Sequence, residues 1–143
     1  MKFSEVFTSK DNIQLDKNTL VTLRWLAFTG QLLTVCLVFF LINFKILFYY
    51  CLIIILLGSL TNLYLQFKVK VNQLSNFTST IFLFYDLLQL ASLLYLTGGI
   101  TNPFSILLII PSIVSSTFLN LRSTINLSII TIVILISLTV YHF

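Results

Sequence analysis

The heptapeptide Gly98–Phe104 (GGITNPF) combines residue types that could bind a flat, lipid-soluble ring. Two adjacent glycines allow a ligand to approach the backbone closely, and Phe104 offers an apolar face. The helix expected to begin here has N–H donors at Phe104, Ser105 and Ile106. The side chain of Asn102 cannot satisfy all three. A quinone, whose carbonyl oxygens accept hydrogen bonds and whose isoprenoid tail stays in the bilayer, fits this combination.

The same heptapeptide is also explained as a plain connection between two helices. Gly98 or Gly99 can take the left-handed conformation that ends a helix. Asn102 is a favourable N-cap, and Pro103 suits the first helical position because it has no N–H group to leave unpaired. On the local residues alone, both interpretations stay open.

A second polar feature is Asp86, an acid inside an apolar segment, with Gln89 about one helical turn further along the same face. A carboxylate in hydrocarbon is costly unless it is protonated or paired, so Asp86 is expected to face a polar interior. It is either a proton-sensitive contact for a head group or for signalling, or a hydrogen bond that holds the bundle together. Gln31 and Thr34 are candidate partners. On a straight helix Asp86 lies roughly 18 Å from Gly98, so one head group cannot touch both.

The elements that must position these residues are membrane helices. Of the 143 residues, 58% are apolar and 8% are charged, whereas a soluble domain has about 25% charged residues. We therefore expect an all-α, polytopic helical membrane bundle, in which about 20 apolar residues form each span. The expected spans are Thr22–Asn43, Ile46–Leu65, Phe77–Leu96, Pro103–Leu119 and Thr124–Tyr141. The fourth is the shortest, and Pro111 is expected to kink it.

The basic residues predict the orientation of these spans. With residues 1–20 as a cytoplasmic lead-in and 21–143 as one membrane domain, seven of the eight Lys and Arg residues fall on the cytoplasmic side, and Lys45 falls outside. Arg24 and Trp25 are interpreted as an interfacial anchor. The heptapeptide then lies at the outer face. The net charge of +4 reflects this topology and attraction to anionic lipid, not nucleic-acid binding.

The remaining reactive residue types do not predict catalysis or a metal site. Cys36 and Cys51 are expected to pack as small apolar groups. His142, the sole histidine, is expected at the outer end of the last span. We interpret it as an interfacial residue and not as a phosphorylation site.

Four sequence segments together resemble a known family. The heptapeptide matches the GGxxNPF pattern of RegB-type (PrrB/ActS) redox-sensing histidine kinases. LRWLAFTGQ (Leu23–Gln31) resembles that family's first span, YDLLQLASLLYLTGG (Tyr85–Gly99) its third, and LRSTINL (Leu121–Leu127) the start of its fifth. The resemblance implies the N-terminal transmembrane sensor domain of such a kinase in a bacterial inner membrane, with a ubiquinone-type quinone as the sensed ligand. The site residues it implies are Gly98, Gly99, Asn102, Pro103 and Phe104.

The family usually has six spans followed by a cytoplasmic kinase domain, which this sequence lacks. The chain is therefore expected to be a part of such a protein and not to catalyse phosphotransfer by itself. The resemblance further implies a homodimer, and a cytoplasmic response regulator that is reached through the kinase domain. Two alternatives stay open. One is a small transporter component or assembly factor with no kinase link and with Asp86 on a substrate or proton path. The other is a fragment of a decayed kinase gene.

Overall fold

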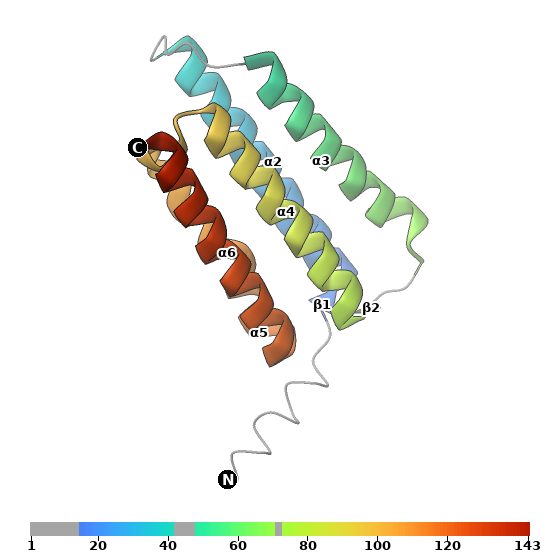
Figure 1. The fold of residues 1–143 in the computed structure, drawn as a ribbon. Coiled ribbons are helices and arrows are strands. Elements are labelled where there is room, and N and C mark those ends of the chain that lie inside the picture. Colours follow the sequence, from blue (N-terminus) through green and yellow to red (C-terminus); the bar gives the residue numbers. More distant parts are fainter. Residues whose placement is uncertain (1–14, 42–47, 71–72) are drawn as a thin grey trace.

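The computed structural model describes residues 15–41, 48–70 and 73–143. Its long helices lie side by side (Figure 1). In chain order the elements are β1 (Leu15–Asp16), α2 (Lys17–Phe40), α3 (Phe48–Lys68), β2 (Gln73–Leu74), α4 (Asn76–Leu96), the 3-10 helices η1 (Gly99–Thr101) and η2 (Pro103–Ile109), α5 (Ile110–Phe118) and α6 (Leu121–His142). The predicted all-α bundle is confirmed. The two strands form one antiparallel ladder of two residue pairs.

Four of the helices are long and apolar enough to cross a membrane, and the chain is a multi-pass membrane protein. Three of them, α3, α4 and α6, begin and end within three residues of their predicted bounds. Helix α2 begins at Lys17, five residues before the predicted Thr22. The β1–β2 ladder brings Lys17 to the end of α3, where its ammonium group donates to the carbonyl oxygen of Val69 at 2.7 Å. A cation at that end is favourable because helix carbonyls there lack partners.

The fourth predicted span, Pro103–Leu119, corresponds to the apolar segment Pro103–Phe118, which is shorter than the other four. It consists of seven residues of 3-10 helix followed by nine of α-helix. At about 2.0 Å and 1.5 Å per residue, these add up to roughly 28 Å, close to the about 30 Å of a hydrocarbon core. At Pro111, where a kink was predicted, the helix changes from 3-10 to α geometry. Pro111 is the second residue of α5, directly after this change, so its missing N–H coincides with the change in hydrogen-bond pattern.

Short polar residues start two of the helices. The hydroxyl of Ser75 accepts a hydrogen bond from the backbone N–H of Thr78 at the start of α4. The side chain of Asn120 accepts from the N–H of Ser123 at the start of α6, at 2.9 Å. These caps satisfy N–H groups that have no acceptor within the helix, so they fix where α4 and α6 begin.

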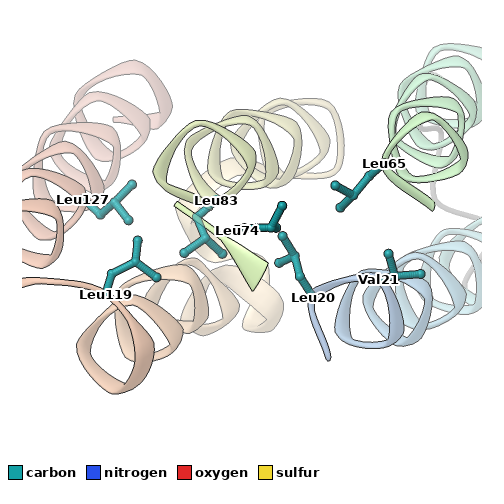
Figure 2. Packing of buried hydrophobic residues seen from close by; sticks show 7 residues of the cluster. All are labelled: Leu20, Val21, Leu65, Leu74, Leu83, Leu119 and Leu127. Atoms are coloured by element: carbon teal, nitrogen blue, oxygen red, sulfur yellow. The ribbon is translucent and has the colours of Figure 1, made fainter. Parts of the chain in front are cut away.

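Helix α4 lies at the centre of the bundle and packs against α3, α5 and α6. Near the ladder, seven buried apolar residues join these helices to α2 (Figure 2): Leu20, Val21, Leu65, Leu74, Leu83, Leu119 and Leu127. Further along α4, a second cluster is shared with η2 and α6, and includes Leu94, Leu108 and Leu138. Because α4 carries both Asp86 and the residues that lead into the heptapeptide, its packing positions every candidate functional residue.

Candidate functional site

The heptapeptide is the turn that follows α4 and leads into η2 (Figure 1). The φ angles are +118° at Gly98 and +62° at Gly99. Residues with a side chain rarely adopt such angles, so both glycines are required by the backbone itself. A ligand is not needed to explain the second glycine.

The side-chain amide of Asn102 stabilises the turn with hydrogen bonds to residues on both sides of it in the chain. Its Oδ1 accepts from the N–H of Phe104 at 2.9 Å, and its Nδ2 donates to the hydroxyl of Thr97 at 2.8 Å. The N–H of Ser105 donates to the carbonyl oxygen of Asn102 at 2.9 Å. The predicted N-cap, with Pro103 in the first turn, is confirmed. The expectation of open donors was wrong for Phe104 and Ser105, because both N–H groups are taken by the one asparagine.

The last turn of α6 lies against the heptapeptide. A Cβ atom at Gly99 would lie 3.6 Å from Nδ1 of His142 and 3.7 Å from its Cβ. The sequence predicted an interfacial role for this histidine and gave no sign that it would meet the turn. Phe104 keeps 39% of its surface exposed, while Asn102 is 9% exposed. The heptapeptide therefore presents an aromatic face from a turn whose polar side chains are bonded internally.

A groove of about 530 Å³ is lined along α4 by residues that end at Leu96, two residues before the heptapeptide. It follows the seam between Leu88–Leu96 of α4 and Ile134–Tyr141 of α6, and Ile54 of α3 borders it. The rings of Tyr95 and Tyr141 meet at one end, with centroids 4.7 Å apart and planes at 48°. Neither tyrosine was predicted as a site residue, because the pairing of α4 with α6 is a tertiary contact.

Asp86 lies in a different part of the bundle and is paired with Arg24. The Nε of Arg24 donates to Oδ1 of Asp86 at 2.9 Å, and its Nη2 donates to the hydroxyl of Thr61 at 2.8 Å. The side chain of Arg24 is 2% exposed and that of Asp86 20%. The guanidinium carbon lies 5.4 Å and 5.1 Å from the ring centres of Phe28 and Phe82. One ion pair with aromatic neighbours thus joins α2, α3 and α4.

This position corrects the prediction that Arg24 anchors the chain at the membrane interface. Because α2 begins at Lys17, Arg24 is two turns inside the helix and faces the bundle, where Asp86 compensates its charge. Trp25, the other half of the predicted anchor, is 37% exposed and its indole N–H donates to Gln66 at 3.4 Å. The pairing gives a structural role to Asp86, the acid that the transporter alternative placed on a substrate or proton path.

Gln89 occupies a second polar contact about one turn along α4. Its Nε2 donates to Oε1 of Gln31 at 2.9 Å, as predicted, whereas the hydroxyl of Thr34 donates to the carbonyl oxygen of Gly30 in its own helix. Gly58 of α3 leaves the room that this amide fills, because a Cβ there would overlap the Gln89 side chain. Asp86 and Gln89 therefore act on the α2–α3 side of α4, away from the groove with α6.

The two cysteines fit their predicted packing roles. Cys51 is fully buried in a cluster with Val35, Ile55 and Leu93, and Cys36 is partly buried. Neither forms a disulfide. The candidate functional site therefore consists of the heptapeptide, the end of α6 and the groove, with the Arg24–Asp86 pair as a separate structural feature.

Comparison with known proteins gives one informative match. Over 125 residues, 87% of its length, the chain is 33% identical to the sensor histidine kinase RegB of Cereibacter sphaeroides. The match covers 27% of that protein, so the chain spans about a quarter of the length of this relative. No protein-family model and no solved structure matches the chain.

Proposed function

We propose, from the premise that this chain is a relative of RegB-type sensor histidine kinases and fits the N-terminal membrane sensor domain of one, that it senses the redox state of a membrane quinone. The ligand is a ubiquinone-type quinone. The residues that hold it are those of the family pattern: Gly98, Gly99, Asn102, Pro103 and Phe104.

The observation that carries this proposal is the internally bonded turn with an exposed aromatic ring. Asn102 uses both ends of its amide within the turn, so Phe104 is held in a fixed position while 39% of its surface stays open. Aromatic rings attract one another in offset or edge-to-face arrangements worth about 0.5–1.5 kcal/mol. A quinone ring that enters from the lipid meets such a surface at Phe104.

Sensing also requires the two redox forms to favour different conformations. The oxidised quinone offers only hydrogen-bond acceptors, whereas the quinol also offers donors. The heptapeptide links α4 to η2, and the last turn of α6 rests on Gly99. A change at the heptapeptide therefore acts on three helices at once. We propose that α6 passes this change towards a kinase domain, which acts in a homodimer on a cytoplasmic response regulator.

The proposed location is a bacterial inner membrane, with the N-terminus in the cytoplasm and the heptapeptide at the outer face. Because Arg24 is buried in the bundle, it no longer counts among the basic residues that predict the orientation. Of the remaining seven basic residues, six still fall on the cytoplasmic side.

Ubiquinone binding to the chain in nanodiscs tests the proposal, with empty nanodiscs as the reference for partition into lipid. Phe104→Ala removes the aromatic face and is expected to weaken binding of a short-chain ubiquinone about three- to tenfold. Phe84→Ala is the matched control, because Phe84 of α4 is 38% exposed against 39% for Phe104. Isothermal titration gives both affinities. Equal affinities for the two variants, or no binding by the parent chain beyond lipid partition, would overturn the proposal.

A further inference from the structure

The polar side chains of the heptapeptide are used within the turn. The amide of Asn102 is bonded at both ends, and the hydroxyl of Thr101 donates to the carbonyl oxygen of Gly98 at 2.7 Å. The N–H groups of Phe104 and Ser105 are also taken. A head group with two polar oxygens therefore finds its side-chain hydrogen-bond partners outside the heptapeptide.

Two such partners, the hydroxyls of Tyr95 and Tyr141, come from the two walls of the groove. Tyr95 lies two residues before Thr97, whose hydroxyl accepts a hydrogen bond from the side chain of Asn102. Tyr141 is followed by His142, which lies against Gly99. At the tyrosine end, both walls of the groove are therefore in contact with the heptapeptide through neighbouring residues. A ligand that moves α4 and α6 apart at this end acts directly on the heptapeptide.

The groove has the size and polarity of a site for an amphipathic ring with a tail. Its volume of about 530 Å³ falls within the about 300–1,000 Å³ of small-molecule sites. From Leu88 to Leu96 it extends along α4 for about 12 Å. The hydroxyls of Ser92 and Ser137 donate to carbonyl oxygens of their own helices. The accessible polarity is therefore concentrated in the tyrosine hydroxyls at one end, and the rest of the wall is apolar.

We infer that the quinone head group lies where the heptapeptide meets the Tyr95–Tyr141 end of the groove, and that its tail follows the α4–α6 seam. This inference rests on the proposed function, which supplies the ligand class. A tyrosine hydroxyl both donates and accepts, so the pair can bond the carbonyl of a quinone or the hydroxyl of a quinol. An acyl chain would make no use of the two hydroxyls. Tyr95 and Tyr141 are thus assigned as ligand-binding residues outside the family pattern.

Two kinds of variant test the assignment in nanodiscs. Tyr95→Phe with Tyr141→Phe keeps the rings and removes the hydroxyls, and is expected to weaken short-chain ubiquinone binding at least about fivefold, the effect of losing one hydrogen bond. Tyr64→Phe is the control, since Tyr64 of α3 is exposed but does not line the groove. Ser137→Phe fills the groove and is expected to weaken binding more than tenfold. Ser116→Phe is its control, because Ser116 is also exposed and bonds a carbonyl of its own helix.

A photoreactive short-chain ubiquinone adds a readout that does not depend on affinity. Crosslinks are expected on peptides from Leu88–Leu96 and Ile134–Tyr141. Helical circular dichroism and the thermal midpoint show whether each variant folds, and Ala91→Leu replaces Ser137→Phe as a smaller obstruction if the latter unfolds.

The outcomes separate this inference from the proposed function. If Phe104→Ala weakens binding while the tyrosine and groove-filling variants match their controls, the quinone proposal stands and the groove assignment is overturned. If the groove-filling variant changes only phospholipid retention or oligomeric state, the groove holds a lipid chain or a second copy, and the assignment is again overturned. If the parent chain binds no ubiquinone, both fail together.

Discussion

Arg24 shows how much one buried side chain can determine in this bundle. It bonds Asp86 and Thr61, and its Nη1 has no hydrogen-bond partner among the described residues. The rings of Phe28 and Phe82 lie beside the guanidinium instead. The free-energy cost of taking a charge out of water is offset only by a close partner of opposite charge. Burial of Arg24 therefore depends on Asp86, and burial of Asp86 on Arg24.

Removing one member of this pair is expected to be costly. Asp86→Ala leaves Arg24 buried and uncompensated, and should lower the free energy of unfolding by about 3–5 kcal/mol. Arg24→Met combined with Asp86→Leu keeps the side-chain volume and removes both charges. The free energy of unfolding of this double variant should therefore be much closer to that of the parent chain. Unfolding of the chain in detergent, followed by circular dichroism, measures all three. If the double variant were no more stable than Asp86→Ala, the pair would not be the reason for the loss.

Gly58 is the second residue whose identity is explained by a tertiary contact. Gly58→Ala places a Cβ into the side chain of Gln89, and overpacking of this kind costs about 1–3 kcal/mol. Adding Gln89→Ala should recover part of that loss. Gly30→Ala is the control, because no atom lies within 4 Å of the position of its Cβ. In an open helical position the exchange should stabilise α2 by about 0.5–1 kcal/mol. Equal effects at the two glycines in thermal unfolding would contradict this explanation.

At the scale of single residues, the sequence predicted local roles well and distant pairings poorly. Asn102 was identified as a cap because the acceptor and its N–H donor are two residues apart. Gln31 was named as a partner of Gln89 because both are polar residues in apolar helices. Arg24 was missed because the predicted helix began at Thr22, which left the arginine at the membrane surface. Its partner is 62 residues away in the chain, and no spacing rule reaches that far.

At the scale of elements, the turn and the 3-10 helix after it form the least regular part of the bundle. The change from 3-10 to α geometry at Ile110 was not predicted, because apolar content and length do not distinguish the two geometries. A 3-10 stretch of seven residues is longer than usual and often marks a hinge or local strain. The predicted span Pro103–Leu119 was nevertheless correct at its start, where Asn-Pro begins the element, and one residue too long at its end, because Leu119 adopts an extended conformation.

The two glycines of the turn should differ in their tolerance of a side chain. Gly98→Ala is expected to be the more destabilising, because φ = +118° lies well outside the left-handed helical region. Gly99→Ala, at φ = +62°, should cost about 1–2 kcal/mol, and Gly99→Asn less, because asparagine tolerates that region. Thermal unfolding in detergent ranks the three. A smaller loss for Gly98→Ala than for Gly99→Ala would contradict the described backbone.

The cap at Asn102 permits a graded test of the same element. Asn102→Ala removes both the acceptor for Phe104 N–H and the donor to Thr97, and should cost about 1–2 kcal/mol. Asn102→Asp keeps the acceptor and loses the donor, so an intermediate loss is expected. Asn126→Ala, at an exposed position of α6, should stay within about 0.5 kcal/mol of the parent. If Asn102→Asp were as destabilising as Asn102→Ala, the cap would contribute little.

At the scale of the whole molecule, the helical membrane bundle followed from composition and apolar lengths alone. What the sequence could not supply is the arrangement, in which α4 is central, meets α2 through polar side chains, and meets α3 and α6 largely through apolar ones. All the helices are apolar on most of their surface, so hydrophobicity does not specify which faces meet. The groove at the α4–α6 seam could therefore be recognised only in three dimensions.

Orientation is the property of the whole molecule that labelling tests directly. With Cys36 and Cys51 replaced by Ala, a single cysteine is introduced at Thr101 of the heptapeptide or at Lys70 after α3, both of which are exposed. A membrane-impermeant maleimide added to intact cells should label the first and not the second until the cells are permeabilised. The reverse pattern would place the heptapeptide in the cytoplasm.

The Arg24–Asp86 pair also bears on how the chain enters the bilayer during synthesis. The carboxylate is made 62 residues after the guanidinium, a delay of roughly 3–12 s at about 5–20 residues per second. During that interval Arg24 has no counter-charge, and its long side chain keeps it near the aqueous boundary. We therefore expect α2 to be inserted shallowly at first and to reach its final depth only after α4 leaves the ribosome. The depth of α2 in the bilayer would then depend on translation of α4.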